Sequence, residues 1–212
     1  AYEMTSSLVG SEMCLRDRGM TIILKESGRL TSIVEELLDI SRIQSGRMKL
    51  MTEKIDLVAE LDEAVYMLKE RSIQERKHLM FDSPIEPFPA VMGDKNRLRQ
   101  VFLNIIDNAL KYTPEGGNVI VQILNKETNI EVLISDTGCG IAPEDLPKVK
   151  DKFYKANQNV GGSGIGLAVA DEIVQMHGGT LDIESGIGVG TTVKISIPVY
   201  DESQSKEDKG EN

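Results

Sequence analysis

The stretch Asn104-Ile105-Ile106-Asp107-Asn108-Ala109-Leu110-Lys111-Tyr112 decides how the rest of this sequence is interpreted. Asn104, Asn108 and Lys111 recur at three- and four-residue steps, so they lie on one side of a helix, with Tyr112 beside them. Asparagine carbonyl oxygens are hard ligands suited to Mg²⁺, an ion that bridges phosphates. Lys111 can reach phosphate oxygens and Tyr112 can pack on a base or sugar, so this helix is suited to a nucleotide.

A second segment, Asp136-Thr137-Gly138-Cys139-Gly140, follows a run of apolar residues that predicts a strand. A carboxylate at the end of that strand can accept a hydrogen bond from an adenine amino group. The two glycines let the backbone approach a ring closely. Asp-Thr-Gly is also an ordinary turn sequence, so this segment alone does not decide between the two interpretations.

A third segment, Gly161-Gly162-Ser163-Gly164-Ile165-Gly166-Leu167, places four glycines directly before and within a helix start. Backbone N–H groups at a helix N-terminus favour anions, and glycines leave room for phosphates. The polar residues 157–160 before it are expected to be flexible and to close as a lid.

Each segment also has a plainer explanation, since Asp107 and Lys111 can form a surface ion pair and glycine-rich turns are common. All three segments in this order, within about one domain length, are typical of a nucleotide site. The sequence therefore predicts ATP binding.

Composition limits the partners. The chain has 212 residues, a net charge of −10 and a sequence pI of about 4.8, so long-range repulsion makes it a poor binder of nucleic acid or anionic membranes. Part of the acidity lies in residues 201–212, which are predicted to form a disordered tail. Cys14 and Cys139 do not suggest a disulfide framework, so reduced thiols are expected.

Residues 1–46 are predicted to form a helical hairpin. Apolar residues recur at three- and four-residue steps over 20–45, which predicts a long amphipathic helix. Residues 1–13 resemble the end of another helix, with residues 16–19 in the turn. Such a hairpin buries its apolar stripe most simply against a second copy in a four-helix bundle, which predicts a homodimer. The alternative is that the stripe packs on the rest of the chain.

Residues 47–200 are predicted to form one α+β domain, with helices on one side of a mainly antiparallel sheet. Asp94 is the expected N-cap of the asparagine-bearing helix, which ends near Tyr112. The other helices are expected at 58–77 and 164–176. Strands are expected near 54–57, 79–82, 90–93, 118–125, 130–136, 180–185 and 191–198.

Together these residues resemble the catalytic ATP-binding region of sensor histidine kinases, over nearly the whole chain. Asn104–Tyr112 is similar to the family's N box, Asp136–Gly140 to its G1 box, Phe153–Lys155 to its F box and Gly162–Leu167 to its G2 box. Leu37–Arg42 resembles part of the family's dimerisation and phosphotransfer domain. The resemblance implies the layered α/β sandwich of gyrase, chaperone, histidine kinase and mismatch-repair ATPases, preceded by a helical hairpin.

The resemblance also implies a reaction, in which the γ-phosphoryl group of ATP passes to a histidine and then to an aspartate of a response regulator. Asn104 and Lys111 would be catalytic, and Asn104 and Asn108 would bind Mg²⁺. The implied nucleotide-binding set comprises Asn108, Tyr112, Asp136, Gly138, Gly140, Ile141, Lys155, Gly162, Gly164, Ile165, Gly166 and Leu167.

The chain departs from the family's pattern in three places. The phospho-accepting histidine is absent and would precede Ala1, whereas His78 and His177 are expected to be cap or surface residues. Lys155 stands where the family often has arginine, and the lid is short. We therefore expect a cytoplasmic piece of a longer sensor that binds ATP without phosphorylating itself.

Three other functions stay open. A hydrolytic ATPase of the same superfamily carries a general-base glutamate where this chain has Asn104, an amide that cannot abstract a proton from water. A related serine kinase lacks the upstream hairpin. The third is a nucleotide-binding interaction module without catalysis, and the intact motifs argue against it.

Overall fold

The computed structural model describes residues 3–157 and 161–200, with the backbone alone at residues 3–19, 21, 22, 25 and 29. The predicted tail at 201–212 and residues 158–160 of the predicted lid lie outside the described residues. The helices are α1 (Glu3–Gln44), α2 (Leu57–Gln74), α3 (Lys95–Tyr112) and α4 (Gly166–Met176), with a short 3-10 helix at Leu146–Lys148. The strands are β1 (Glu53–Ile55), β2 (His78–Asp82), β3 (Val91–Gly93), β4 (Asn118–Asn125), β5 (Asn129–Asp136), β6 (Thr180–Gly186) and β7 (Gly190–Pro198).

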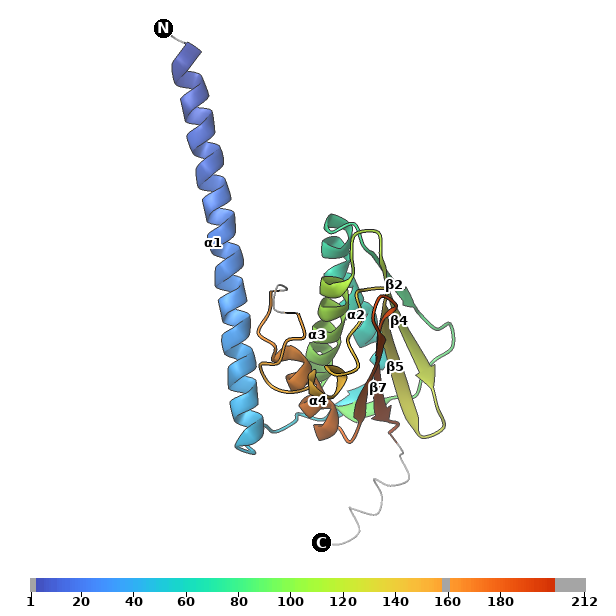
Figure 1. Ribbon diagram of the computed structural model, residues 1–212. Helices are drawn as coiled ribbons and strands as arrows, with labels where there is room; N and C mark the ends of the chain where they lie inside the picture. The colour runs from blue at the N-terminus through green and yellow to red at the C-terminus, as the bar shows by residue number, and fades with distance from the viewer. Residues whose placement is uncertain (1–2, 158–160, 201–212) are drawn as a thin grey trace.

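Five strands form a mixed sheet in the order β2-β4-β5-β7-β6, and α2, α3 and α4 cover one of its faces (Figure 1). β2 runs parallel to β4, and the other neighbouring strands are antiparallel. β1 and β3 form a separate antiparallel pair. This arrangement confirms the predicted α+β layered fold.

The hydrophobic core lies between the sheet and the three helices. Alternate residues of β4 and β5 are buried, because every second side chain of a strand points to the same face. Val121 of β4 lies opposite Ile134 of β5, and both pack in the core with Phe102 of α3. Each such side chain contributes about 1.5–3 kcal/mol when fully buried, so this layer holds the helices that carry the motifs.

The starts of α2 and α3 are fixed by aspartate caps, as predicted for Asp94. The carboxylate of Asp94 accepts hydrogen bonds from the backbone N–H groups of Asn96 and Arg97, both at 3.1 Å. Asp56 caps α2 in the same way, accepting from Val58 N–H at 2.9 Å. These bonds satisfy N–H groups that have no partner within the helix.

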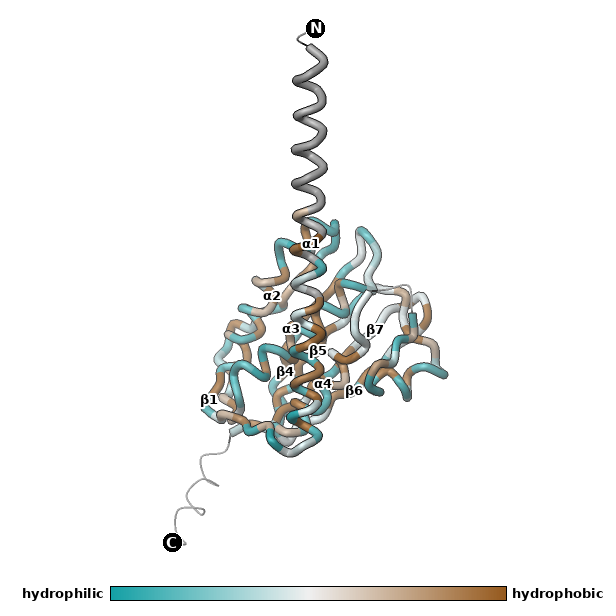
Figure 2. Tube along the Cα trace, turned by 90° about the vertical axis from the view of Figure 1, so that its left-hand side faces the viewer, coloured by the Kyte–Doolittle hydropathy of each residue, from teal (hydrophilic) through white to brown (hydrophobic). Residues whose placement is uncertain are grey.

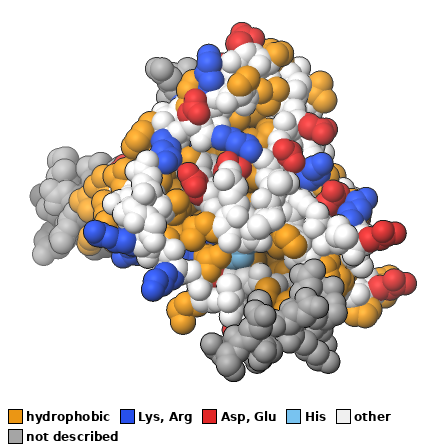
Figure 3. Space-filling view, turned by 90° about the horizontal axis from the view of Figure 1, so that it is seen from below, with side chains coloured by type: hydrophobic (Ala, Val, Ile, Leu, Met, Phe, Trp, Pro, Cys, Tyr) orange, Lys and Arg blue, Asp and Glu red, His pale blue; other side chains and the backbone are white. Residues whose placement is uncertain are grey.

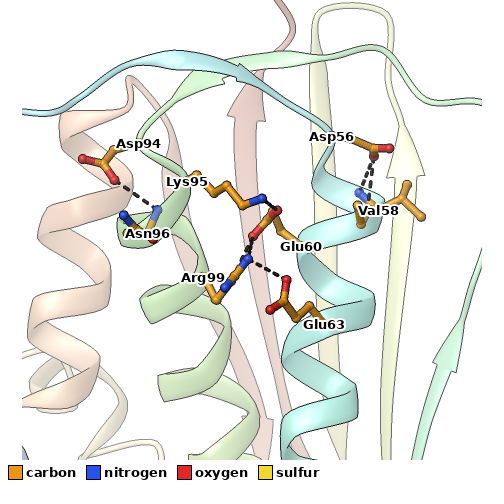
Figure 4. A network of polar contacts seen from close by, with 9 residues as sticks. Asp56, Val58, Glu60, Glu63, Asp94, Lys95, Asn96 and Arg99 are labelled. Carbon is orange, nitrogen blue, oxygen red and sulfur yellow. Dashed lines mark hydrogen bonds and ion pairs between the residues drawn. The ribbon is translucent and has the colours of Figure 1, made fainter.

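A cluster of ion pairs joins α2 to α3 (Figure 4). The carboxylate of Glu60 is 4% exposed and lies 3.0 Å from Lys95 Nζ and 2.7 Å from Arg99 Nη2. Glu63 is 49% exposed and contacts the same Arg99 nitrogen at 2.6 Å. Because Glu60 is buried, its carboxylate is stabilised by these two cations, whereas the exposed carboxylate of Glu63 is also stabilised by water.

α1 is one continuous helix from Glu3 to Gln44, so the turn predicted at residues 16–19 does not form and the predicted hairpin at 1–46 is wrong. That prediction relied on glycines and a polar run. A glycine in a helix interior costs about 1 kcal/mol without ending the helix, and residues 3–44 contain no proline that would break it.

The C-terminal half of α1 lies against the rest of the chain and passes in front of α3 and α4 when viewed from its own side (Figure 2). Ile40 is 7% exposed and belongs to the hydrophobic core. The buried carboxylate of Asp39 accepts hydrogen bonds from Arg97 Nη1 at 2.7 Å and Gln100 Nε2 at 2.9 Å. These contacts fix the lower end of α1 to α3.

Higher up, α1 exposes an apolar stripe. Its exposed large hydrophobic side chains, among the residues described, are Met20, Ile23, Leu24, Leu30, Val34, Leu37 and Leu38. Seen from below, hydrophobic side chains gather on the side where α1 lies, and charges of both signs are scattered over the rest of the view (Figure 3). These side chains therefore do not pack on the rest of the chain. Within the described ranges, no helix combines the length and apolar character that crossing a membrane requires.

Candidate functional site

A cavity of about 800 Å³ opens between α3, the start of α4, the turn after β5 and the middle of α1. Most of the residues predicted for the nucleotide site line this cavity. They are Asn104, Asn108, Lys111, Tyr112, Asp136, Gly140, Ile141, Lys155, Gly162, Gly164, Gly166 and Leu167. The fold thus brings the three sequence segments together around one space.

Two predicted residues lie behind the cavity wall. Ile165 is 1% exposed in the hydrophobic core, and its backbone N–H donates to Ser163 Oγ at 3.1 Å. Gly138 is buried, and its N–H donates to Asp136 Oδ1 at 2.8 Å. Neither lines the cavity, so their part is to support their neighbours.

Asn104 and Asn108 line the cavity from successive turns of α3. The amide nitrogen of Asn104 donates to the carbonyl oxygen of Gly166 at 3.3 Å, which leaves its Oδ1 for a ligand. Mg²⁺ takes oxygen ligands and keeps several waters and phosphate oxygens, so two amide oxygens beside bound phosphates fit its needs. No group of three or more His, Cys, Asp or Glu residues able to hold a metal occurs among the residues described. The amide oxygens of Asn104 and Asn108 are therefore suited to Mg²⁺ bound together with phosphates.

Lys111 brings a positive charge to the cavity. Burial lowers the pKa of its ammonium group, and the nearby Asp107 opposes that shift. The ammonium lies against Gly162, where any Cβ would overlap it. Asp107 hydrogen-bonds Arg71 of α2, so its close partner is not Lys111. This arrangement favours an anionic ligand for Lys111 over the plainer surface-pair interpretation.

Asp136 ends β5 at the cavity wall. Burial raises the pKa of its carboxyl group, and hydrogen bonds from the N–H groups of Gly138 at 2.8 Å and Thr191 at 3.3 Å oppose the shift. Both bonds go to Oδ1, so Oδ2 is left as an acceptor for a ligand. A partly buried carboxylate with one spare acceptor suits an N–H donor such as an adenine amino group.

Gly140 holds the turn after β5 against the β6–β7 hairpin. Its φ is +70°, and a Cβ there would overlap the carbonyl oxygen of Gly186. The close approach lets Gly188 N–H donate to the carbonyl oxygen of Cys139 at 2.8 Å. Only glycine fits this position without strain, so Gly140 shapes the cavity through the backbone.

α4 begins without a side-chain cap, with Ile165 as its N-cap residue. Its first-turn N–H groups are therefore not satisfied by a capping side chain, and the helix dipole adds partial positive charge there. Gly162 and Gly164 precede it with φ of +139° and +73°. An uncapped helix start behind a glycine-rich turn is suited to phosphate.

The sequence did not predict that α1 forms part of the cavity wall. Glu26, Ser32, Ile33 and Glu36 line it, and Glu36 accepts a hydrogen bond from Ser163 of the glycine segment. No local pattern could have revealed this contact, because it depends on how two segments far apart in the chain fold together.

Neither histidine lines the cavity. His78 is the exposed first residue of β2. His177 is the C-cap of α4; its Nε2 accepts the N–H of Asp94 at 2.9 Å, and its Nδ1 lies 2.7 Å from the carbonyl oxygen of Ile173. The predicted surface and cap roles are thus confirmed.

The family model for histidine kinase-, DNA gyrase B- and HSP90-like ATPases matches residues 93–201, just over half of the chain. The chain belongs to this ATPase family. Its matched ATPase domain begins directly before α3 and contains all three motif segments that line the cavity.

The homologues of this ATPase domain include named histidine kinases. The histidine protein kinase DivJ of Caulobacter vibrioides is 34% identical over 181 residues, which cover 84% of this chain and 30% of that protein. The solved structure of the histidine kinase AdeS of Acinetobacter baumannii is similar with a TM-score of 0.70 and 25% identity, covering 86% of this chain and 84% of that one. Full-length ShkA in complex with AMPPNP has a TM-score of 0.76 over 87% of this chain and 39% of its own, and at 24% identity it shows the fold alone.

These similarities place the ATPase domain in the sensor histidine kinase branch of the family, as the catalytic ATP-binding domain. The chain spans between about a quarter and a half of the length of the first curated relatives that it matches.

Proposed function

We propose that this chain is the catalytic part of a sensor histidine kinase that transfers the γ-phosphoryl group of ATP to a histidine for relay to an aspartate of a response regulator. One observation carries the proposal: the three motif segments converge on one cavity beside the uncapped start of α4. Family membership supports it, as does the name of DivJ, a histidine protein kinase. ShkA, which shares the fold, is described in complex with AMPPNP, an ATP analogue.

In this proposal the base of ATP lies beside Asp136, which accepts a hydrogen bond from the adenine amino group, and Tyr112 packs near the ring. Lys111 and the N–H groups at the start of α4 bind the phosphates. Asn104 and Asn108 would hold Mg²⁺ through their amide oxygens. The ion, when bound, neutralises the phosphate charge.

Catalysis then rests on positioning and charge neutralisation, because phosphoryl transfer asks for little covalent chemistry from the protein. Asn104 cannot abstract a proton from water, which favours transfer to a histidine over hydrolysis. Neither His78 nor His177 lines the cavity, so the acceptor is a different histidine. A relay partner with a receiver domain, a cytoplasmic location and dimerisation through α1 belong to the same proposal.

Asn108→Asp tests the metal and phosphate site. The substitution places a carboxylate against the phosphates, so we expect Mg-ATP affinity, measured by isothermal titration calorimetry, to fall by at least about tenfold. Asn96→Asp is the matched control, because Asn96 is an exposed residue of the same helix that does not line the cavity. Unchanged affinity of Asn108→Asp would remove Asn108 from the site.

The reaction itself is tested by mixing the chain with γ-labelled ATP, Mg²⁺ and a separately made helix that carries an acceptor histidine of the family. Acid-labile label on that helix is expected. If ATP binds in the cavity and the helix stays unlabelled, the result counts against the kinase proposal and favours a nucleotide-binding module.

A further inference from the structure

A carboxylate from α1 stands among the groups assigned to phosphate. Glu36 accepts a hydrogen bond from the hydroxyl of Ser163, in the middle of the glycine segment. A Cβ built on Gly166 would lie 3.7 Å from Glu36 Oε1 and 3.6 Å from Asn104 Nδ2. Glu36 and Asn104 therefore flank the same point of the cavity wall, at the start of α4.

Glu36 is partly buried beside two groups that stabilise its negative charge. Burial raises the pKa of its carboxyl group, and the hydrogen bond from Ser163 and the charge of Lys111 oppose that shift. Asp107 and Asp39 add smaller contributions that raise it further. The two groups that stabilise the charge of Glu36 are thus Ser163, which lies in the glycine segment, and Lys111, which would bind phosphate.

We infer that Glu36 is an internal competitor of the terminal phosphates of ATP, so that nucleotide binding and docking of α1 on the glycine segment oppose each other. This inference rests on the proposed function, because it takes the cavity to be the ATP site. Its content is regulatory: the position of α1 sets the affinity of the site.

The electrostatic argument is direct. A carboxylate and a triphosphate repel each other at close range, most strongly where burial reduces screening by water. Lys111 and Ser163 cannot fully serve both anions at once. Either the carboxylate leaves when the phosphates enter, or it stays and weakens their binding.

The second contact of α1 allows such a release. Asp39 lies three residues after Glu36 and is bound by Arg97 and Gln100 of α3, outside the glycine segment. Ile40 beside it is buried in the core. Loss of the Glu36–Ser163 bond therefore removes the contact of α1 with the glycine segment while the lower end of α1 stays attached. By reciprocity of linked equilibria, docking of α1 on the glycine segment weakens ATP binding by the same factor by which ATP binding weakens this docking. Whatever draws α1 away from the glycine segment therefore strengthens ATP binding.

Glu36→Gln tests the inference, because glutamine keeps the size and a hydrogen-bond acceptor but removes the charge. We expect Mg-ATP to bind about fivefold to tenfold more tightly than to the unsubstituted chain, within the usual range of coupling between sites. The gain should be larger for ATP than for ADP, because the competition concerns the terminal phosphate. Glu35→Gln, at the exposed neighbouring residue, is the matched control and should change neither affinity.

The outcomes separate the inference from the function beneath it. If the unsubstituted chain binds Mg-ATP and Glu36→Gln binds it equally or more weakly, the inference is overturned and the proposed function stands; weaker binding would make Glu36 part of the metal site. Equal gains for ATP and ADP would also overturn competition at the terminal phosphate. If neither protein binds ATP while both show an intact melting transition, the proposed function falls and the inference falls with it.

Discussion

At the scale of single residues, the cavity holds charged groups where burial disfavours their charge. Burial raises the carboxyl pKa of Asp136 and of Glu36, and it lowers the ammonium pKa of Lys111. Groups whose pKa is perturbed in this way cluster at functional sites. Keeping these side chains charged at neutral pH therefore costs the folded chain some stability.

Asp136→Asn makes this cost measurable. The pKa of Asp136 is higher in the folded chain than the usual value of about 3.9, so ionisation costs stability at neutral pH and costs nothing once the pH falls below that usual value. Asparagine keeps an oxygen for the N–H groups of Gly138 and Thr191. We expect the variant to melt at a higher temperature than the unsubstituted chain at pH 7, with the difference shrinking as the pH falls toward 4.

The same substitution should weaken ATP binding by about tenfold and reduce the preference for ATP over GTP, because the asparagine side chain presents an N–H₂ group toward the adenine amino group. Asp182→Asn, at an exposed position of β6, is the control and should alter neither property. If discrimination between ATP and GTP survives in Asp136→Asn, another group reads the base.

At the scale of secondary-structure elements, the ion-pair cluster between the starts of α2 and α3 is built around one buried carboxylate. Glu60→Ala would leave Lys95 and Arg99 without their buried partner, so we expect a loss of about 2–3 kcal/mol in the free energy of unfolding, measured by urea denaturation. Glu63→Ala removes an exposed partner of the same arginine and should cost less than about 1 kcal/mol. Equal losses would mean that burial of Glu60 does not decide the strength of the cluster.

The elements that were predictable from sequence are those with local causes. α3 starts after Asp94 because an aspartate can satisfy free N–H groups of the first turn, and β5 is marked by its run of apolar residues. The continuity of α1 was not predictable in this way, since a glycine such as Gly19 fits either a turn or a costly helix position. Ile165 was assigned to the nucleotide because it lies within the glycine segment, yet the fold turns its side chain into the core.

At the scale of the whole molecule, α1 has two different faces. One face supplies Glu36 to the cavity and Asp39 and Ile40 to α3 and the core. The other leaves large apolar side chains in contact with solvent, including Leu30 at 63% exposure and Val34 at 53%. The apolar spacing over residues 20–45 predicted the apolar stripe on the outer face. The inner face depends on long-range contacts, which a single sequence does not reveal.

An exposed apolar stripe on a long helix is best covered by a second copy, since burying one leucine contributes roughly 1.5–3 kcal/mol and a two-fold interface counts each residue twice. We expect the chain to be dimeric by light scattering at high concentration. Leu30→Glu should raise the dissociation constant of that dimer by at least about 100-fold, because it both removes apolar burial and places a charge in the interface. Leu124→Glu, the same change at an exposed leucine of β4, is the control and should leave the dimer intact. A strictly monomeric unsubstituted chain, or equal weakening by both variants, would contradict pairing through α1.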